Sequence, residues 1–273
     1  MSSEDCGNAT TPDAETSPFI VLLRLELRGA FRRRHGVALA SMGAMGVVLA
    51  FWLPTFPHSV LRFFQRVFQL DTWAQIVVAN DLTGLFFFVY WIAVFDVLTI
   101  YVVPLEERRL DLYLSKPLSR RAYLFARLLP VLLTSAGIYT VAAATHWLTL
   151  GMARLSYPPG AFVGAAGALL GWTVLLVAIV NLAASWARES YSALLIAFVP
   201  MALSILPSMV YMYRPDVLMA APKVRDLIVF PLNLVWYPDI AAHLGLWIAT
   251  LFFVLAIAVA SFCGWLVERS DVG

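Results

Sequence analysis

The sequence has few charged residues. Asp, Glu, Lys and Arg make up only 13% of its 273 residues, whereas 61% are hydrophobic. The mean hydropathy is +0.81. A soluble domain of this length does not need so much apolar surface, so the composition predicts a multi-spanning membrane protein. The net charge of +2 says little, because the distribution of the charges along the chain matters more than their sum.

Cysteine is also scarce. The chain has only Cys6 and Cys263, near opposite ends, which excludes a disulfide framework and a metal-ligand spacing. No apolar run precedes Cys6, so we do not expect a lipoprotein-type signal. Residues 1–17 lack the basic-then-apolar order of a cleaved signal peptide.

Familiar catalytic motifs are missing from the sequence. It contains no GxxxxGK(S/T) phosphate loop, no HExxH and no Gly-x-Ser-x-Gly turn. No segment between the apolar runs is long enough for a soluble catalytic domain. We therefore expect this chain to hold no catalytic residues, no metal and no cofactor, and to have no means of hydrolysing ATP itself.

Six apolar runs are each long enough to cross roughly 30 Å of hydrocarbon. Helices of this length satisfy their own backbone hydrogen bonds in lipid, so the predicted fold class is an all-α integral membrane protein with six transmembrane helices. The predicted spans are residues 37–56, 82–103, 128–150, 161–184, 191–212 and 244–267.

Two shorter segments precede the transmembrane domain, which we assign to residues 35–273. Residues 1–17 are rich in Ser, Thr, Asp, Glu and Ala and are predicted to form a disordered cytoplasmic tail. Residues 18–34 fit an amphipathic helix lying in the membrane interface, although a positively charged flank of the first span is the alternative. An apolar helix face beside a stripe of arginines carries this prediction: Phe19, Leu23, Leu27, Ala30 and Phe31 beside Arg24, Arg28 and Arg32.

The basic residues predict the orientation. With the N-terminus inside, 13 of the 19 Lys and Arg residues fall on cytoplasmic segments. Because basic residues favour the cytoplasmic side, we expect both termini in the cytoplasm and the chain in the cytoplasmic (inner) membrane.

Both longer outer segments contain apolar residues. Helical spacing in residues 58–80 predicts a short helix on the outer leaflet. Residues 213–243 include VFPLNLVWYPD, which fits either a segment that dips back toward the membrane or a surface loop with aromatic anchors.

A few polar residues lie within the apolar runs. Asp96 is interpreted as the only acidic side chain well inside a span, and with Asn181 it is a candidate for the translocation path. Asp96 is also close enough to the inner end of its span to reach the interface. An interhelical hydrogen bond is an equally good interpretation of Asn181 and His146. Gly160, Gly164, Gly167 and Gly171 predict close helix packing in the fourth span.

The densest charged segment is residues 105–123, LEERRLDLYLSKPLSRRAY, between the second and third predicted spans. Helical spacing places Leu110 and Leu114 one turn apart on the membrane side, with charged residues toward solvent. Pro117 ends this helix, and Ser119 is expected to cap the next one. A basic loop that only fixes topology is the simpler alternative.

This segment resembles the inner loop of membrane subunits of type-2 ATP-binding-cassette exporters. That loop commonly has an acidic residue, a short linker and then L-x-L-L-L-S-x-P-(V/I/L)-S-R and an aromatic residue. The matching residues are Glu106, Leu110, Leu112, Leu114, Ser115, Pro117, Leu118, Ser119, Arg120 and Tyr123. Arg108 and Arg109 stand where the family usually has Gly-Thr. The predicted layout, with a basic interfacial helix and six spans, is also similar.

The resemblance implies a permease subunit whose loop is a cytoplasmic coupling helix docked in a separate ATP-binding-cassette ATPase. ATP and Mg would bind to that ATPase, and a second permease subunit, most simply a second copy, would complete the unit within membrane lipid. No nucleic acid is implied as a partner, and the substrate stays open. The residues implied to couple to the ATPase are Glu106, Glu107, Arg108, Arg109, Asp111, Leu114, Ser115, Lys116, Pro117, Ser119, Arg120 and Arg121.

Two other classes remain as alternatives. An ion-coupled secondary transporter would need several paired charges at mid-membrane depth in two related halves, and the sequence offers one acid and no evident repeat. A membrane-embedded enzyme would need clustered polar residues at the helix ends. The four histidines, His35, His58, His146 and His243, are instead scattered.

Overall fold

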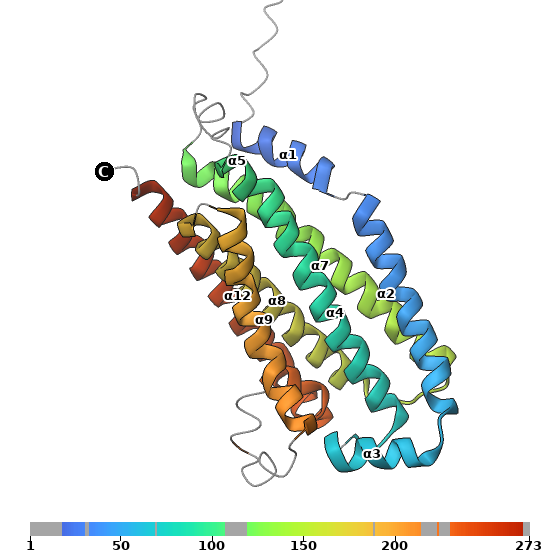
Figure 1. The fold of residues 1–273 in the computed structure, drawn as a ribbon. Coiled ribbons are helices and arrows are strands. Elements are labelled where there is room, and N and C mark those ends of the chain that lie inside the picture. The colour runs from blue at the N-terminus through green and yellow to red at the C-terminus, as the bar shows by residue number, and fades with distance from the viewer. Residues whose placement is uncertain are drawn as a thin grey trace, which may run out of the picture.

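The computed structural model describes residues 18–30, 33–68, 70–106, 119–187, 189–213, 223 and 230–269. Within these residues the chain is helical and has no β-strand. Long helices run side by side, with α1 (Pro18–Ala30) at the end of the bundle where α12 (Pro238–Arg269) finishes (Figure 1). The short helix α3 (His58–Phe68) lies at the opposite end, where the sequence predicted a short helix.

Five described helices are long and apolar enough to cross a membrane. This confirms the all-helical class and the multi-pass composition predicted from the sequence. The five candidate spans are His35–Thr55, Trp73–Val102, Arg120–Met152, Pro159–Trp186 and Pro238–Arg269. The fifth predicted span, 191–212, is helical, as α9 (Ser190–Tyr213), but its described apolar part, Ser190–Ser204, is shorter than a span. Six crossings therefore stay a prediction.

Capping residues set where the helices begin, and the apolar runs did not reveal these starts. α4 (Trp73–Val97) begins nine residues before the predicted span at 82, because Thr72 and Gln75 form a capping box. It continues through a π-helical turn, η2 (Leu98–Val102), into α5 (Val103–Glu106). Ser119 caps α7 (Arg120–Met152) as predicted, and its hydroxyl accepts a hydrogen bond from the Ala122 amide at 3.2 Å.

The structure describes most of the first predicted helix. α1 covers Pro18–Ala30, Arg33 and Arg34 belong to α2 (Arg33–Trp52), and residues 31 and 32 lie outside the described residues. The placement of α1 in the membrane interface stays a prediction.

The segment before α12 packs inside the protein. The 3-10 turn η3 (Leu232–Val235) is buried, and Val235 is 1% exposed. It contacts α4, α8 (Pro159–Ala187) and α12. This part of residues 213–243 is therefore shielded by protein and is not an exposed surface anchor, while its dip toward the membrane stays a prediction.

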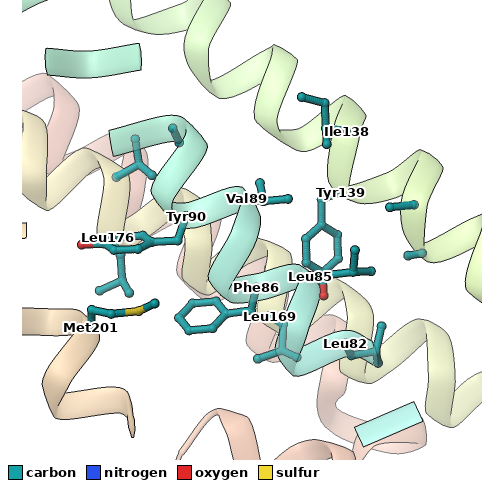
Figure 2. Packing of buried hydrophobic residues seen from close by; sticks show 14 of the residues in the cluster. Leu82, Leu85, Phe86, Val89, Tyr90, Ile138, Tyr139, Leu169, Leu176 and Met201 are labelled. Atoms are coloured by element: carbon teal, nitrogen blue, oxygen red, sulfur yellow. The ribbon is translucent and has the colours of Figure 1, made fainter. Parts of the chain in front are cut away.

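The core is built around α4 and α8. The most apolar stretch is 61% buried in the candidate span Trp73–Val102 and 67% buried in Pro159–Trp186, against 17% in His35–Thr55. Figure 2 shows Phe86 and Tyr90 of α4 beside Leu176 of α8 and Met201 of α9. The Tyr90 hydroxyl donates to the Ala197 carbonyl of α9 at 2.6 Å, which satisfies a buried polar group.

Glycines allow α8 and α12 to approach closely, as the four-glycine pattern predicted. A Cβ atom on Gly164 would overlap the Ala241 carbonyl oxygen, and one on Gly245 would overlap the backbone of Gly164. The two backbones are therefore in direct contact, which is typical of small residues at membrane helix interfaces.

This contact predicts different effects for two glycines of α8. Gly164→Ala should destabilise the protein by about 1–3 kcal/mol, because the added methyl meets backbone that no side-chain rotation can clear. Gly160→Ala is the matched control, since its new Cβ would lie 3.7 Å from the Ala242 Cβ. We would measure thermal unfolding midpoints of both variants in detergent. Equal midpoints would contradict the close contact.

Candidate functional site

The central part of the predicted coupling segment, residues 107–118, lies outside the described residues. This part contains Glu107, Arg108, Arg109, Asp111, Leu114, Ser115, Lys116 and Pro117. The structure describes what flanks it: α5 ends at Glu106, and α7 begins at Arg120. These two ends lie at the same end of the bundle as α1 and the last turn of α12 (Figure 1).

Arg121, predicted to face the ATPase, also packs on its own subunit. Its guanidinium carbon lies 5.8 Å from the centre of the Phe125 ring, which is cation–π distance. A Cβ built on Gly264 of α12 would lie 3.0 Å from the Cγ of Arg121. The stem of Arg121 therefore lies against α12 while the residue stays exposed.

An ion pair ties α1 to α7 close to this segment. The Arg127 Nη1 donates to the Glu26 Oε1 at 2.6 Å, and the two side chains are 13% and 20% exposed. The Arg127 guanidinium also lies 5.2 Å from the centre of the Tyr123 ring. Sequence reasoning counted Arg127 only toward the orientation and assigned no role to Glu26.

Asp96 faces α2. It is 3% exposed, and its Oδ2 lies 2.8 Å from the Nε2 of His35 in a buried hydrogen bond. Sequence reasoning missed His35 as the partner, because it stands at the edge of the first apolar run. Asp96 is therefore buried inside the bundle. A role in translocation stays a prediction.

Asn181, the other candidate path residue, lies on α8 and contacts α12. Its Nδ2 donates to the Sγ of Cys263 at 3.6 Å, and Ser185 lies 3.2 Å from the same sulfur. Asn181 also lines a cavity of about 10 Å³ together with Tyr101 and Arg127. That volume suits about one water molecule. Tyr101 belongs to the π-helical turn, a feature that often marks functional positions. Asp96 does not line this cavity, so the structure does not bring the two path residues together.

A second buried acid corrects the sequence interpretation that Asp96 is alone. Asp81 of α4 is 1% exposed, and its Oδ2 lies 2.6 Å from the Nδ1 of His146 on α7. His146 therefore contacts another helix, although the contact is not the interhelical hydrogen bond that one interpretation predicted. Asp81 was placed just outside the second span because it directly precedes the apolar run. The Thr72–Gln75 capping pattern was the signal that could have extended the helix to include it.

Comparisons with known proteins add no assignment. No family model, no curated protein and no solved structure matches the chain. The residues of this chain and the loop resemblance are therefore what indicate a function.

The Glu26–Arg127 pair predicts how α1 is held. Arg127→Gln should cost about 1–2 kcal/mol, because it leaves a half-buried carboxylate without its charged partner. The readout is hydrogen–deuterium exchange of the Pro18–Ala30 amides, which should become faster. The swapped pair Glu26→Arg with Arg127→Glu should restore slow exchange. Unchanged exchange in Arg127→Gln would show that this pair does not hold α1.

Proposed function

We propose that this chain is the permease subunit of an ATP-binding-cassette exporter, moving an unidentified substrate across or out of the membrane. ATP hydrolysis is assigned to a separate cytoplasmic ATPase that binds ATP and Mg. The observation that carries the proposal is the charged 105–123 segment, with its motif from Glu106 to Tyr123, set between two long apolar helices.

The flanking structure supports a force-transmitting role. α4 and α7 meet this segment, α4 through η2 and α5, and both helices pack against α8 in the core. The Glu26–Arg127 pair braces the same end of α7. In the proposed mechanism, closure of the ATPase on ATP pushes the segment, and α4 and α7 shift the bundle between two states. The subunit itself then needs no chemistry.

The proposed assembly has two permease subunits, most simply two copies of this chain, and two ATPases in the cytoplasmic membrane. Orientation follows from the basic residues, which place both termini and the 105–123 segment in the cytoplasm. The apolar faces of the helices contact membrane lipid.

The buried Asp–His pairs favour one second candidate function, an ion-coupled secondary transporter. Sequence reasoning argued against this class because it found a single acid in a span. The structure has two acids on α4, each beside a histidine: Asp96 with His35, and Asp81 with His146. Transport that continues in vesicles without ATP and follows an imposed pH gradient would favour this candidate over the permease.

The proposed topology predicts which positions react with an impermeant thiol reagent in intact cells. Single cysteines at Ser3, Ser119 and Ser270 should stay unlabelled because they are cytoplasmic, in a background without Cys6 and Cys263. Cysteines at Ser156 and Asp216 should be labelled. External labelling of the first group would reverse or break the topology.

The permease proposal predicts that the charges of the segment contact an ATPase. Glu106→Lys with Glu107→Lys should leave membrane insertion intact, because added inside charge favours the same orientation. It should weaken ATPase binding by about 1–3 kcal/mol, roughly 5- to 150-fold. The measurement is recovery of ATP-binding-cassette ATPases with the tagged chain, normalised to its membrane yield.

A matched control reverses two other glutamates. Glu189 and Glu268 are exposed and lie at the helix ends on the same predicted side, so Glu189→Lys with Glu268→Lys should keep ATPase recovery at the parental level. Parental recovery in the Glu106/Glu107 variant would remove those residues from the docking surface. Intact assembly after deletion of residues 109–116 would reduce the segment to a topological anchor.

A further inference from the structure

Asp81 and His146 form an isolated polar pair inside the bundle. Both residues are 1% exposed, and the Oδ2–Nδ1 distance of 2.6 Å is short enough for an ion pair. The contact is not aligned as a hydrogen bond, so neither ring nitrogen of His146 has a hydrogen-bond partner among the described residues. Oδ1 of Asp81 likewise has none there. This pair therefore differs from His35–Asp96, which is hydrogen bonded.

No other ionised side chain of the surrounding helices can neutralise the pair. Residues 36–52 of α2, 128–152 of α7 apart from His146, and 159–187 of α8 contain no Asp, Glu, Lys, Arg or His. Besides the His35–Asp96 pair, the other buried titratable side chains of the described residues are Tyr90, Tyr101, Tyr123, Tyr139, Tyr157 and Cys263. Burial raises the pKa of Tyr157, in the turn after α7, to about 12, so it also stays neutral. The charged residues and histidines described at this end of the bundle are exposed: His58, Arg62, Arg66, Asp71, Arg154, Lys223, Asp239 and His243.

Gly46 of α2 provides the space for the His146 ring. A Cβ atom on Gly46 would overlap Cε1 and Nδ1 of the imidazole, so the ring lies directly against the α2 backbone. Three helices therefore meet at this site: α4 supplies Asp81, α7 supplies His146, and α2 supplies a surface without a side chain.

We propose that Asp81 and His146 together form a proton-binding site in the interior of the bundle, seated by Gly46. The site holds one proton, so the pair carries no net charge. Without this proton the buried site would carry one negative charge, and with a second it would carry one positive charge. Either state is costly where no other charge compensates it.

One bound proton makes a distinct prediction for pH dependence. Between about pH 4 and 6.5 the unfolded chain also carries one proton on this pair, on the histidine, so stability from the site is constant. Above about pH 6.5 the unfolded histidine releases its proton while the folded site keeps one, so stability falls as pH rises.

The stability of the two single variants should change with pH in opposite directions. In His146→Gln the buried carboxyl of Asp81 must hold a proton that the unfolded chain releases above about pH 4, so stability falls as pH rises. In Asp81→Asn the buried imidazole stays neutral while the unfolded histidine takes up a proton below about pH 6.5. Stability then falls as pH decreases.

The experiment compares thermal unfolding midpoints of the full chain in detergent between about pH 5 and 8. The reference is the double variant Asp81→Asn with His146→Gln, which cannot titrate at this site and cancels the pH dependence of all other groups. Relative to it, the wild-type midpoint should be level below about pH 6.5 and fall by about 2–5 °C per pH unit above it. A wild-type difference that stays level above about pH 6.5 would show that the pair carries no proton there and would overturn the proposal. If a single variant does not fold, the comparison of the wild type with the double variant still tests the proposal.

Gly46 is tested against Gly43, one turn earlier on α2. Gly46→Ala should displace the imidazole, lower the midpoint and reduce the slope above about pH 6.5. In Gly43→Ala the new Cβ would lie 3.8 Å from the Cγ2 of Thr145, so both quantities should match the wild type. If the midpoint of Gly46→Ala falls with pH as steeply as that of the wild type, Gly46 does not position the proton-binding site.

Discussion

The burial of two carboxyl groups on α4 is the constraint on which the arrangement of the first half of the chain depends. An acidic side chain inside an apolar bundle must be paired or neutralised. Asp96 meets this need through His35 of α2, and Asp81 through His146 of α7. Each pair thus fixes a neighbouring helix against α4 near a different end, in a bundle where apolar packing alone is not directional. The same constraint explains why a glycine, Gly46, faces one of the histidines.

Most of the fold could be predicted because a long apolar run has few structural options in a membrane. The apolar runs predicted the helices but not where they begin, because hydrogen-bonding residues such as Thr72 and Ser119 set the helix starts. The Asp81–His146 pair was missed for the same reason. A single aspartate beside an apolar run has the appearance of a loop residue until the helix start is known. Contacts across helices, such as Glu26 with Arg127, leave no periodic pattern in one sequence.

For the candidate coupling segment, the sequence and the structure contribute different information. Its residue pattern from Glu106 to Tyr123 carries the functional proposal, and the structure contributes the two helices that flank it. Arg121 illustrates what sequence alone could not show. It was assigned to a partner surface, and its stem also packs along α12 beside Phe125. A substitution there would therefore alter the subunit as well as any docking face.

The backbone contact between Gly164 and Gly245 limits how the protein can move. Two helices that touch through their main chains have no flexible side chains between them to absorb sliding, so a shift along the interface would drive carbonyl groups into each other. We therefore expect α8 and α12 to move together as one unit. Any rearrangement of the bundle has to be carried by the other helices moving against this pair, with α4, which packs on α8, at the boundary between the moving and stationary parts.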